Sequence, residues 1–165
     1  TLTSVVPQVR ELPMDLLDEL LACFGWTLQD LELGLPVRLA YAGAWHPILP
    51  VATRALLAEM AYDFDRLQRL MRDRSWTTVQ VVWREDVNRF HARDPFPPGG
   101  VVEDPATGAA AAALGAYLVD VGVLHPPERI EVRQGEDLGR PSTLLVDLQP
   151  GDPRVRVSGT AVPIP

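Results

Sequence analysis

The sequence contains no lysine, because all 15 of its basic residues are arginines. Mechanisms that need a lysine amine, such as Schiff-base formation, are therefore excluded. Cys23 is the single cysteine, so the chain can form neither an internal disulfide nor a Cys-x-x-Cys redox pair nor a multi-cysteine zinc site. This thiol content fits a reducing compartment best, and we expect a cytoplasmic protein.

Long hydrophobic runs are missing as well. The longest, residues 109–119, is much shorter than the roughly 20 residues that cross a bilayer, so we expect neither a membrane span nor a membrane partner. Residues 1–4 lack the basic and apolar regions of a signal peptide. The 22 acidic residues outnumber the basic ones and give a net charge of -7, which argues against nucleic acid as a partner.

What is present fits one folded domain. A chain of 165 residues can bury one core, and 47% hydrophobic with 22% charged residues is typical of a globular protein. The hydrophobic periodicity predicts helices at residues 13–24, 54–60, 64–71 and 107–120. It predicts strands at residues 3–10, 37–42, 48–52, 77–83, 89–92, 130–134, 142–148 and 154–163, with a turn at 43–47 and a long loop at 93–107.

The helix expected at residues 107–120 is apolar on nearly every face. Alanine fills positions 109 to 113, and Leu114, Tyr117 and Leu118 follow. A helix without a polar face is normally buried on all sides. We therefore expect this helix at the centre of the core.

The loop before this helix carries two adjacent carboxylates, Glu103 and Asp104. The first N–H groups of a helix lack intrahelical partners and lie at the positive end of its dipole, so those of Thr107, Gly108 and Ala109 are candidates to hold a substrate carboxylate. Asp104 either caps the helix or exchanges a proton with a bound substrate. Adjacent side chains in an extended chain point in opposite directions, so Glu103 is expected to be a structural hydrogen-bond partner.

Residues 103–110 read Glu-Asp-Pro-Ala-Thr-Gly-Ala-Ala, and this run closely resembles a motif of the phenazine-biosynthesis isomerase (PhzF-like) family. The resemblance extends to Gly-Ala-Trp-His at residues 43–46, to Gln-Gly-Glu at 134–136 and to Gly-Arg-Pro-Ser at 139–142. It also includes residues 91–93, 96–97, 114–118 and 157–162. It therefore covers most of the chain.

The resemblance implies an α+β fold of the diaminopimelate-epimerase-like type. In that fold each of two similar lobes is a curved, barrel-like mixed β-sheet wrapped around a central apolar helix, and the active site lies between the lobes. Members of the family are about twice as long, so residues 1–165 match a single lobe, the second. The first lobe and its acid/base Glu are absent from this chain.

The resemblance further implies an isomerase that needs no cofactor and moves protons on a small carboxylated substrate. Asp104 is the catalytic residue that it assigns to this lobe. The substrate-binding positions are Gly43, His46, Thr107, Gly108 and Ala109, and His46 is expected in the turn before a strand, where it either reaches the cleft or serves only the turn or the core.

Two further expectations concern the chemistry of the site. Ala109 stands where the family usually has a serine, so one hydroxyl donor to the substrate is missing. No two of the three histidines have the i, i+4 spacing of a metal-binding helix, so no metal site is expected.

Two hypotheses about function stay open. In the first, the chain is the second lobe of a PhzF-like isomerase and is completed by a first lobe that is a separate chain or an absent part of the same protein. In the second, the lobe is a stand-alone, non-catalytic binding domain, for instance a homodimer whose paired lobes imitate the two-lobe cleft.

Overall fold

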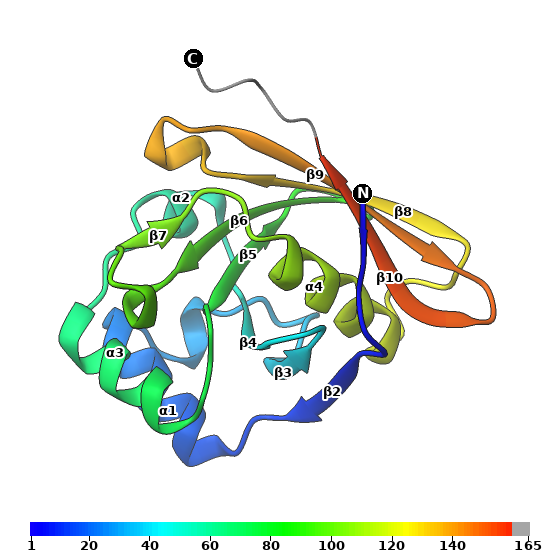
Figure 1. The fold of residues 1–165 in the computed structure, drawn as a ribbon. Helices are drawn as coiled ribbons and strands as arrows, with labels where there is room; N and C mark the ends of the chain where they lie inside the picture. Colours follow the sequence, from blue (N-terminus) through cyan, green and yellow to red (C-terminus); the bar gives the residue numbers. More distant parts are fainter. Residues whose placement is uncertain (160–165) are drawn as a thin grey trace.

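The computed structural model describes residues 1–159 and shows a strongly curved β-sheet around one helix (Figure 1). The strands are β1 (Leu2–Thr3), β2 (Gln8–Glu11), β3 (Arg38–Tyr41), β4 (Trp45–Pro50), β5 (Gln80–Arg84), β6 (Arg89–Pro95), β7 (Glu103–Asp104), β8 (Glu128–Gln134), β9 (Ser142–Gln149) and β10 (Asp152–Gly159). The α-helices are α1 (Met14–Phe24), α2 (Arg54–Ala58), α3 (Phe64–Asp73) and α4 (Gly108–Asp120). Short 3-10 helices are η1 (Leu28–Asp30), η2 (Pro97–Gly99) and η3 (Glu136–Leu138).

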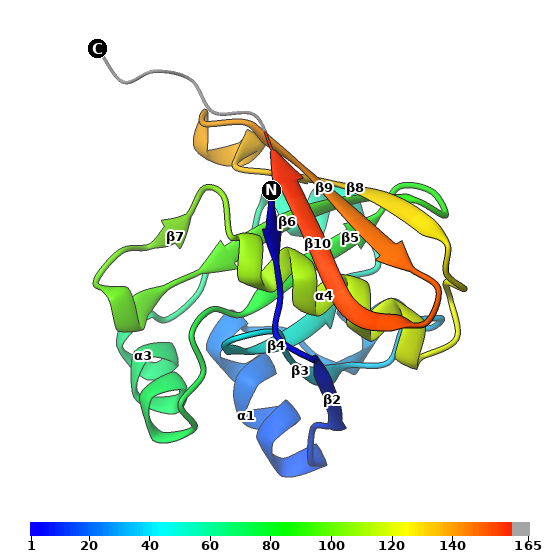
Figure 2. The same ribbon diagram turned by 45° about the vertical axis from the view of Figure 1, so that its right-hand side comes forward.

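The strands follow the order β1-β10-β9-β8-β6-β5-β4-β3-β2, and β7 pairs with β6 beside this path. The pairs β4–β5 and β6–β8 are parallel, whereas the other pairs are antiparallel. Parallel neighbours need a crossover. The first crossover runs through α2 and α3 and the second through β7 and α4, so α4 enters the hollow of the sheet (Figures 1 and 2).

The concave face of the sheet packs around α4. Residues 110–115 of this helix are buried, as are Tyr117 and Leu118, which confirms the central helix expected from its composition. Small side chains let the sheet approach closely, because a Cβ atom at Gly115 would lie 2.8 Å from Cγ1 of Val146. The Tyr117 hydroxyl donates to the carbonyl of Pro36 at 2.9 Å and so satisfies the one polar group of this buried face.

A second hydrophobic core covers part of the convex face. The buried side chains of α1 and α3, among them Leu20, Leu67 and Met71, pack with Leu49 and Val81 of the sheet. Cys23 belongs to this core and is 2% exposed, as expected for a buried thiol that behaves as a small hydrophobe. The two cores on either face of one sheet fix its curvature around α4.

The N-terminal segment connects the two edges of the curved sheet. β1 pairs with β10, whereas β2 pairs with β3, so residues 4–7 span the gap between the edges and pass in front of α4 (Figure 2). The expected single strand at residues 3–10 is therefore wrong, because its halves pair with opposite edges.

The four predicted helices are confirmed, and three segments differ from the predictions. The turn expected at residues 43–47 is shorter, since β4 begins at Trp45 opposite Tyr41 and only residues 42–44 turn, with Gly43 at φ +117°. The loop expected at residues 93–107 is partly sheet, since Asp94 pairs with Asp104. The strand expected at 154–163 is β10 up to Gly159, and residues 160–163 lie outside the described part of the chain.

None of the helices in residues 1–159 is long and apolar enough to cross a bilayer.

Candidate active site

The predicted site lies where β7 leads into α4. Asp104 is half-buried and holds the start of the helix: its Oδ2 accepts from the Thr107 hydroxyl at 2.8 Å. Its Oδ1 lies 3.4 Å from the amide nitrogen of Ala106. Neither contact is the helix cap that was one of the two expectations for Asp104, because Thr107 is the N-cap residue of α4 and no side chain caps its first amides. Asp104 instead holds the N-cap residue.

The side chain of Gln134, at the end of β8, holds the segment between β7 and α4 through hydrogen bonds. Sequence reasoning missed this role. The Gln134 side chain is fully buried, and its Oε1 accepts from the amide of Thr107 at 3.0 Å. Its Nε2 donates to the carbonyl of Asp104 at 2.7 Å and to the Thr107 hydroxyl at 3.0 Å. All these groups are removed from water, so each of these contacts is costly to lose.

The Thr107 amide is therefore already occupied, which corrects the expectation that it holds a substrate. The first intrahelical bond runs from the amide of Ala111 to the carbonyl of Thr107 at 3.0 Å, so the amides of Gly108, Ala109 and Ala110 precede the helical ladder. Gly108 and Ala109 are half-buried. They are the N–H groups that an anion could reach at the positive end of the α4 dipole.

Two glycines shape the site. A Cβ atom at Gly108 would lie 2.9 Å from Cδ2 of Leu2, because the N-terminal segment passes over the first turn of α4. Gly135 has φ +79°, and a Cβ atom there would lie 2.2 Å from the carbonyl oxygen of Arg140 and 2.9 Å from that of Pro105. Only glycine fits such a position, and the adjacent Ser142 hydroxyl donates to the same Pro105 carbonyl at 3.0 Å.

Glu103 faces away from Asp104 and forms an ion pair with Arg93. Nε of Arg93 donates to Oε2 of Glu103 at 3.0 Å, and a second contact joins Nη2 to Oε1. The Arg93 Nη1 also donates to the carbonyls of Leu57 at 3.1 Å and Ala58 at 2.9 Å, at the C-terminal end of α2. The Glu103 carboxylate is 2% exposed, so this pair anchors the loop to the convex side of the sheet.

His46 lies on β4, in a buried hydrogen-bonded group rather than in a turn. Its Nδ1 is 2.9 Å from the Thr78 hydroxyl, and that hydroxyl donates to Oδ1 of Asp94 at 2.9 Å. His46 and Asp94 are both 0% exposed. Burial lowers the pKa of His46 to about 4, against the hydrogen bond with Thr78, so this imidazole is neutral at pH 7 and is not open to solvent.

The strand directions place these groups at the same end of the sheet as the start of α4. His46 and Thr78 stand near the beginnings of β4 and β5, which are parallel, and Asp94 stands near the end of β6, which is antiparallel to β5. The turn at Gly43 lies at this end as well. The structure thus brings Gly43 and His46 to the same end of the sheet as the start of α4. Gly43 is exposed there, and His46 is buried.

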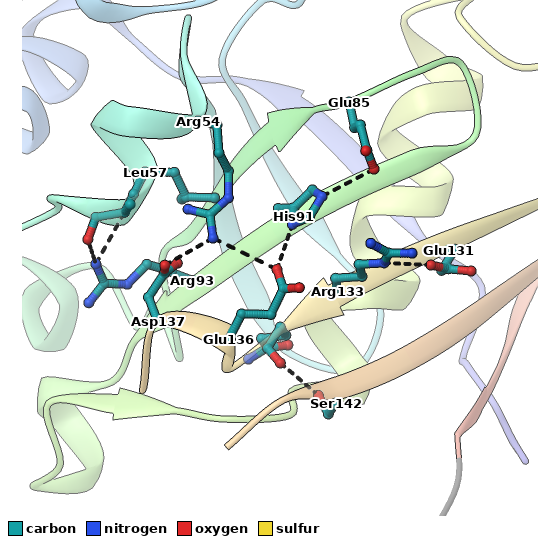
Figure 3. A network of polar contacts seen from close by, with 12 residues as sticks. Arg54, Leu57, Glu85, His91, Arg93, Glu131, Arg133, Glu136, Asp137 and Ser142 are labelled. Atoms are coloured by element: carbon teal, nitrogen blue, oxygen red, sulfur yellow. Dashed lines mark hydrogen bonds and ion pairs between the residues drawn. The ribbon is translucent and has the colours of Figure 1, made fainter. Parts of the chain in front are cut away.

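A second polar network lies on the other side of β6 (Figure 3). The His91 Nδ1 is 2.6 Å from Glu136 Oε2, and Nε2 is 3.2 Å from Glu85 Oε2. The hydrogen bond with His91 lowers the pKa of Glu85. Arg54 pairs with Asp137 at 2.9 Å and with Glu136 at 3.8 Å. These contacts link α2, β6 and η3 to one another on the convex face, which is a structural role.

Other features lie away from the start of α4. A cavity of about 230 Å³ is found at the opposite end of that helix, where its lining includes Pro7, Val9, Ala116, Asp120 and Asp152. Within residues 1–159, no group of three or more His, Cys, Asp or Glu side chains could hold a metal ion.

Comparison with known proteins identifies the family. The profile of the PhzC-PhzF family, described as "Phenazine biosynthesis-like protein", matches residues 2–165. The chain belongs to this family. An uncharacterized isomerase of Deinococcus radiodurans is 35% identical over 142 residues, which are 83% of this chain and 46% of that protein. The trans-2,3-dihydro-3-hydroxyanthranilate isomerase of Pseudomonas chlororaphis is 39% identical over 77 residues, 45% of this chain and 28% of that protein.

A solved structure from Pseudomonas aeruginosa, described as a predicted epimerase, superposes with a TM-score of 0.72 at 30% identity over 94% of this chain and 54% of that one. The expected diaminopimelate-epimerase-like architecture, a curved sheet around a central helix, is thereby confirmed. The PhzF-like chain spans about half the length of the relatives that it matches.

Proposed function

We propose that the chain is the second lobe of a PhzF-like isomerase that moves a proton on a small carboxylated substrate, without a metal or organic cofactor. The observation that carries this proposal is the start of α4, where the Asp104 carboxylate accepts from the hydroxyl of Thr107, the residue before the half-buried Gly108 and Ala109. Its relatives include proteins named as isomerases, which supports the reaction class.

Each group at this site has a distinct role in the proposed reaction. The amides of Gly108 and Ala109 hold the substrate carboxylate, because the helix start offers N–H donors and a positive dipole end. Asp104 accepts or returns the proton. The Thr107 hydroxyl and Gln134 keep Asp104 in place, so the carboxylate is oriented before the substrate arrives.

Completion by a first lobe is part of the proposal. The resemblance to the family places the principal acid/base Glu in the first lobe, so the proposed reaction needs that group in addition to Asp104. The chain covers 46% of its relative from Deinococcus radiodurans, which leaves room in such a protein for another lobe of similar size.

The second candidate is a non-catalytic binding domain. Ala109 favours it, since a hydroxyl expected at this helix position is missing and the amides alone remain to bind the anion. In this case the lobe pairs with a second copy, and carboxylate binding persists without turnover.

Turnover in D2O tests the proposal. The purified protein, with any chain that accompanies it, is incubated with trans-2,3-dihydro-3-hydroxyanthranilate, the compound in one relative's name, and deuterium incorporation is followed by mass spectrometry. We expect incorporation that falls at least 100-fold in Asp104→Asn and persists in Asp120→Asn, a control with the same charge change at the other end of α4. Incorporation that survives Asp104→Asn contradicts the proposed role. Saturable binding of the compound without incorporation favours the binding domain.

A further inference from the structure

Three polar side chains on neighbouring strands form a buried chain beneath the candidate site. His46 of β4, Thr78 before β5 and Asp94 of β6 are joined by contacts of 2.9 Å each. Their exposed fractions are 0%, 1% and 0%. Gln80 of β5 is also 0% exposed and lies opposite Asp94, as the pairing of Val81 with Arg93 requires. The proposed roles of Asp104 and α4 use none of these four side chains.

The sheet register aligns this buried group with Asp104. Asp94 and Asp104 are direct partners in the antiparallel ladder between β6 and β7, so both side chains project from the same face, with Cβ atoms roughly 5 Å apart. The face is the concave one, because Phe90 and Ala92 of β6 belong to the core around α4. Asp94 is therefore the buried neighbour of the half-buried Asp104.

Two carboxyl groups at this spacing do not both carry a charge at low cost. Of the two, Asp104 is only half-buried and accepts from the Thr107 hydroxyl. Asp94 is enclosed and faces Asp104 of β7, together with Thr78, Gln80 and His46, whereas Glu103 and its partner Arg93 project to the opposite face. No cation faces it within the described chain. Burial, and then the two carboxylates, raise the pKa of Asp94 well above its usual range, against the Thr78 hydrogen bond.

Several polar atoms of the group have no partner within residues 1–159. They are Oδ2 of Asp94, Nε2 of His46 and both amide atoms of Gln80. Buried polar atoms are nearly always hydrogen-bonded, and an unsatisfied one costs stability. A purely structural network would use these atoms. The atoms without hydrogen-bond partners instead favour a group that gives and receives a proton.

We propose that Asp94 is a second proton-holding carboxyl of this site and acts through Asp104, with Thr78 and His46 as its positioning residues. This inference rests on the proposed function. In the step, the O–H bond at Oδ2 of Asp94 breaks and an O–H bond forms on the Asp104 carboxylate, which gives that proton to one carbon of the substrate. When Asp104 then takes up the proton that leaves the other carbon, the reverse transfer returns a proton to Asp94. The negative charge passes from Asp104 to Asp94, and no electrons leave or enter the pair.

The partners of Asp94 suit this exchange. The Thr78 hydroxyl donates to Oδ1 of Asp94, so it stabilises the carboxylate formed when the proton leaves. Because the Thr78 hydroxyl hydrogen is donated to Asp94, the Thr78 oxygen accepts from Nδ1–H of His46. This second bond orients the Thr78 hydroxyl toward Asp94. Asp94 does not touch the substrate. Its effect is to return a proton to Asp104 without contact with solvent.

A titration that needs no substrate tests the pairing. The aspartate carboxyl carbons of the chain are labelled with carbon-13, and the NMR signals of Asp94 and Asp104 are followed with pH in the wild type, in Asp104→Asn and in Asp120→Asn. We expect Asp94 to remain protonated at pH 7. In Asp104→Asn its midpoint moves to lower pH, and in Asp120→Asn it stays where it is.

An ionised Asp94 at pH 7, or a midpoint unmoved by Asp104→Asn, overturns the inference. Where turnover is found, Asp94→Asn keeps an acceptor for Thr78 but releases no proton, so kcat falls at least tenfold and one limb of the pH profile disappears while KM is unchanged. An unchanged kcat also overturns it. If no turnover exists but the titration behaves as expected, the carboxyl pair stands and the proposed isomerase function is the part that fails.

Discussion

Acid should destabilise this protein through one buried histidine. His46 has its pKa lowered from 6.5 to about 4, mainly by burial. The unfolded chain therefore binds a proton at His46 below pH 6.5, whereas the folded chain does so only near pH 4. The free energy of unfolding decreases as pH falls from 6.5 to about 4 and loses no more from this group below that.

The size of the effect follows from the shift. One pKa unit corresponds to 1.36 kcal/mol, so a shift of roughly 2.5 units corresponds to about 3 kcal/mol. That is a large part of the 5–15 kcal/mol typical of a domain. Asp94 has the opposite sign, because its pKa is raised in the folded state, and its contribution must be separated from that of His46.

Urea unfolding at pH 7, 6, 5 and 4, followed by tryptophan fluorescence, measures the loss. The His46→Gln variant keeps a polar side chain that does not titrate, so its stability should fall by about 3 kcal/mol less than that of the wild type between pH 7 and 4. His125→Gln, at an exposed position, is the matched control and should follow the wild type. Parallel curves for wild type and His46→Gln refute the reasoning. If His46→Gln does not fold, the imidazole proton signals of the wild type give the same answer, and a midpoint near 6.5 for His46 refutes it.

Substitutions at three positions test the construction of the site. Gln134→Ala leaves the Thr107 amide and the Asp104 carbonyl without partners, so about 2–4 kcal/mol of stability should be lost in urea unfolding; a loss below about 1 kcal/mol would contradict this role. Glu103→Gln removes one partner of a buried ion pair and should cost about 3–5 kcal/mol by the same measurement, an expectation that fails if the loss resembles that of an exposed pair. Ala109→Ser adds a hydroxyl at the helix start and should tighten binding of 3-hydroxyanthranilate by 2- to 10-fold in calorimetry, the worth of one hydrogen bond; weaker binding would contradict it.

The helices, and the opposite directions of Glu103 and Asp104, could be predicted from local sequence. The run of alanines in α4 has no polar face, and such a helix has one stable place, inside the sheet. The Glu103–Asp104 pair could also be divided correctly, because neighbouring side chains on an extended chain point in opposite directions. In the structure, Asp104 accepts from the Thr107 hydroxyl at the start of α4, whereas Glu103 forms an ion pair with Arg93.

The buried polar group could not be predicted, because long-range pairing creates it. His46 and Thr78 are 32 residues apart in the chain, and Thr78 and Asp94 are 16 apart. Asp94 stands in a proline-rich segment that reads as a loop, and only its register with β7 identifies it as a strand residue facing Asp104. Gln134 carried one usable signal, since it precedes a glycine that the turn requires.

The central claim is that the start of α4 binds a carboxylate beside Asp104. Titration of the nitrogen-15-labelled chain with 3-hydroxyanthranilate, read by amide NMR shifts, tests it most directly. The account predicts that the largest saturable shifts occur at Gly108 and Ala109 and that the matching compound with an amide in place of the carboxylate causes none there. Shifts confined to the cavity at the other end of α4, around Val9 and Ala116, would contradict the account.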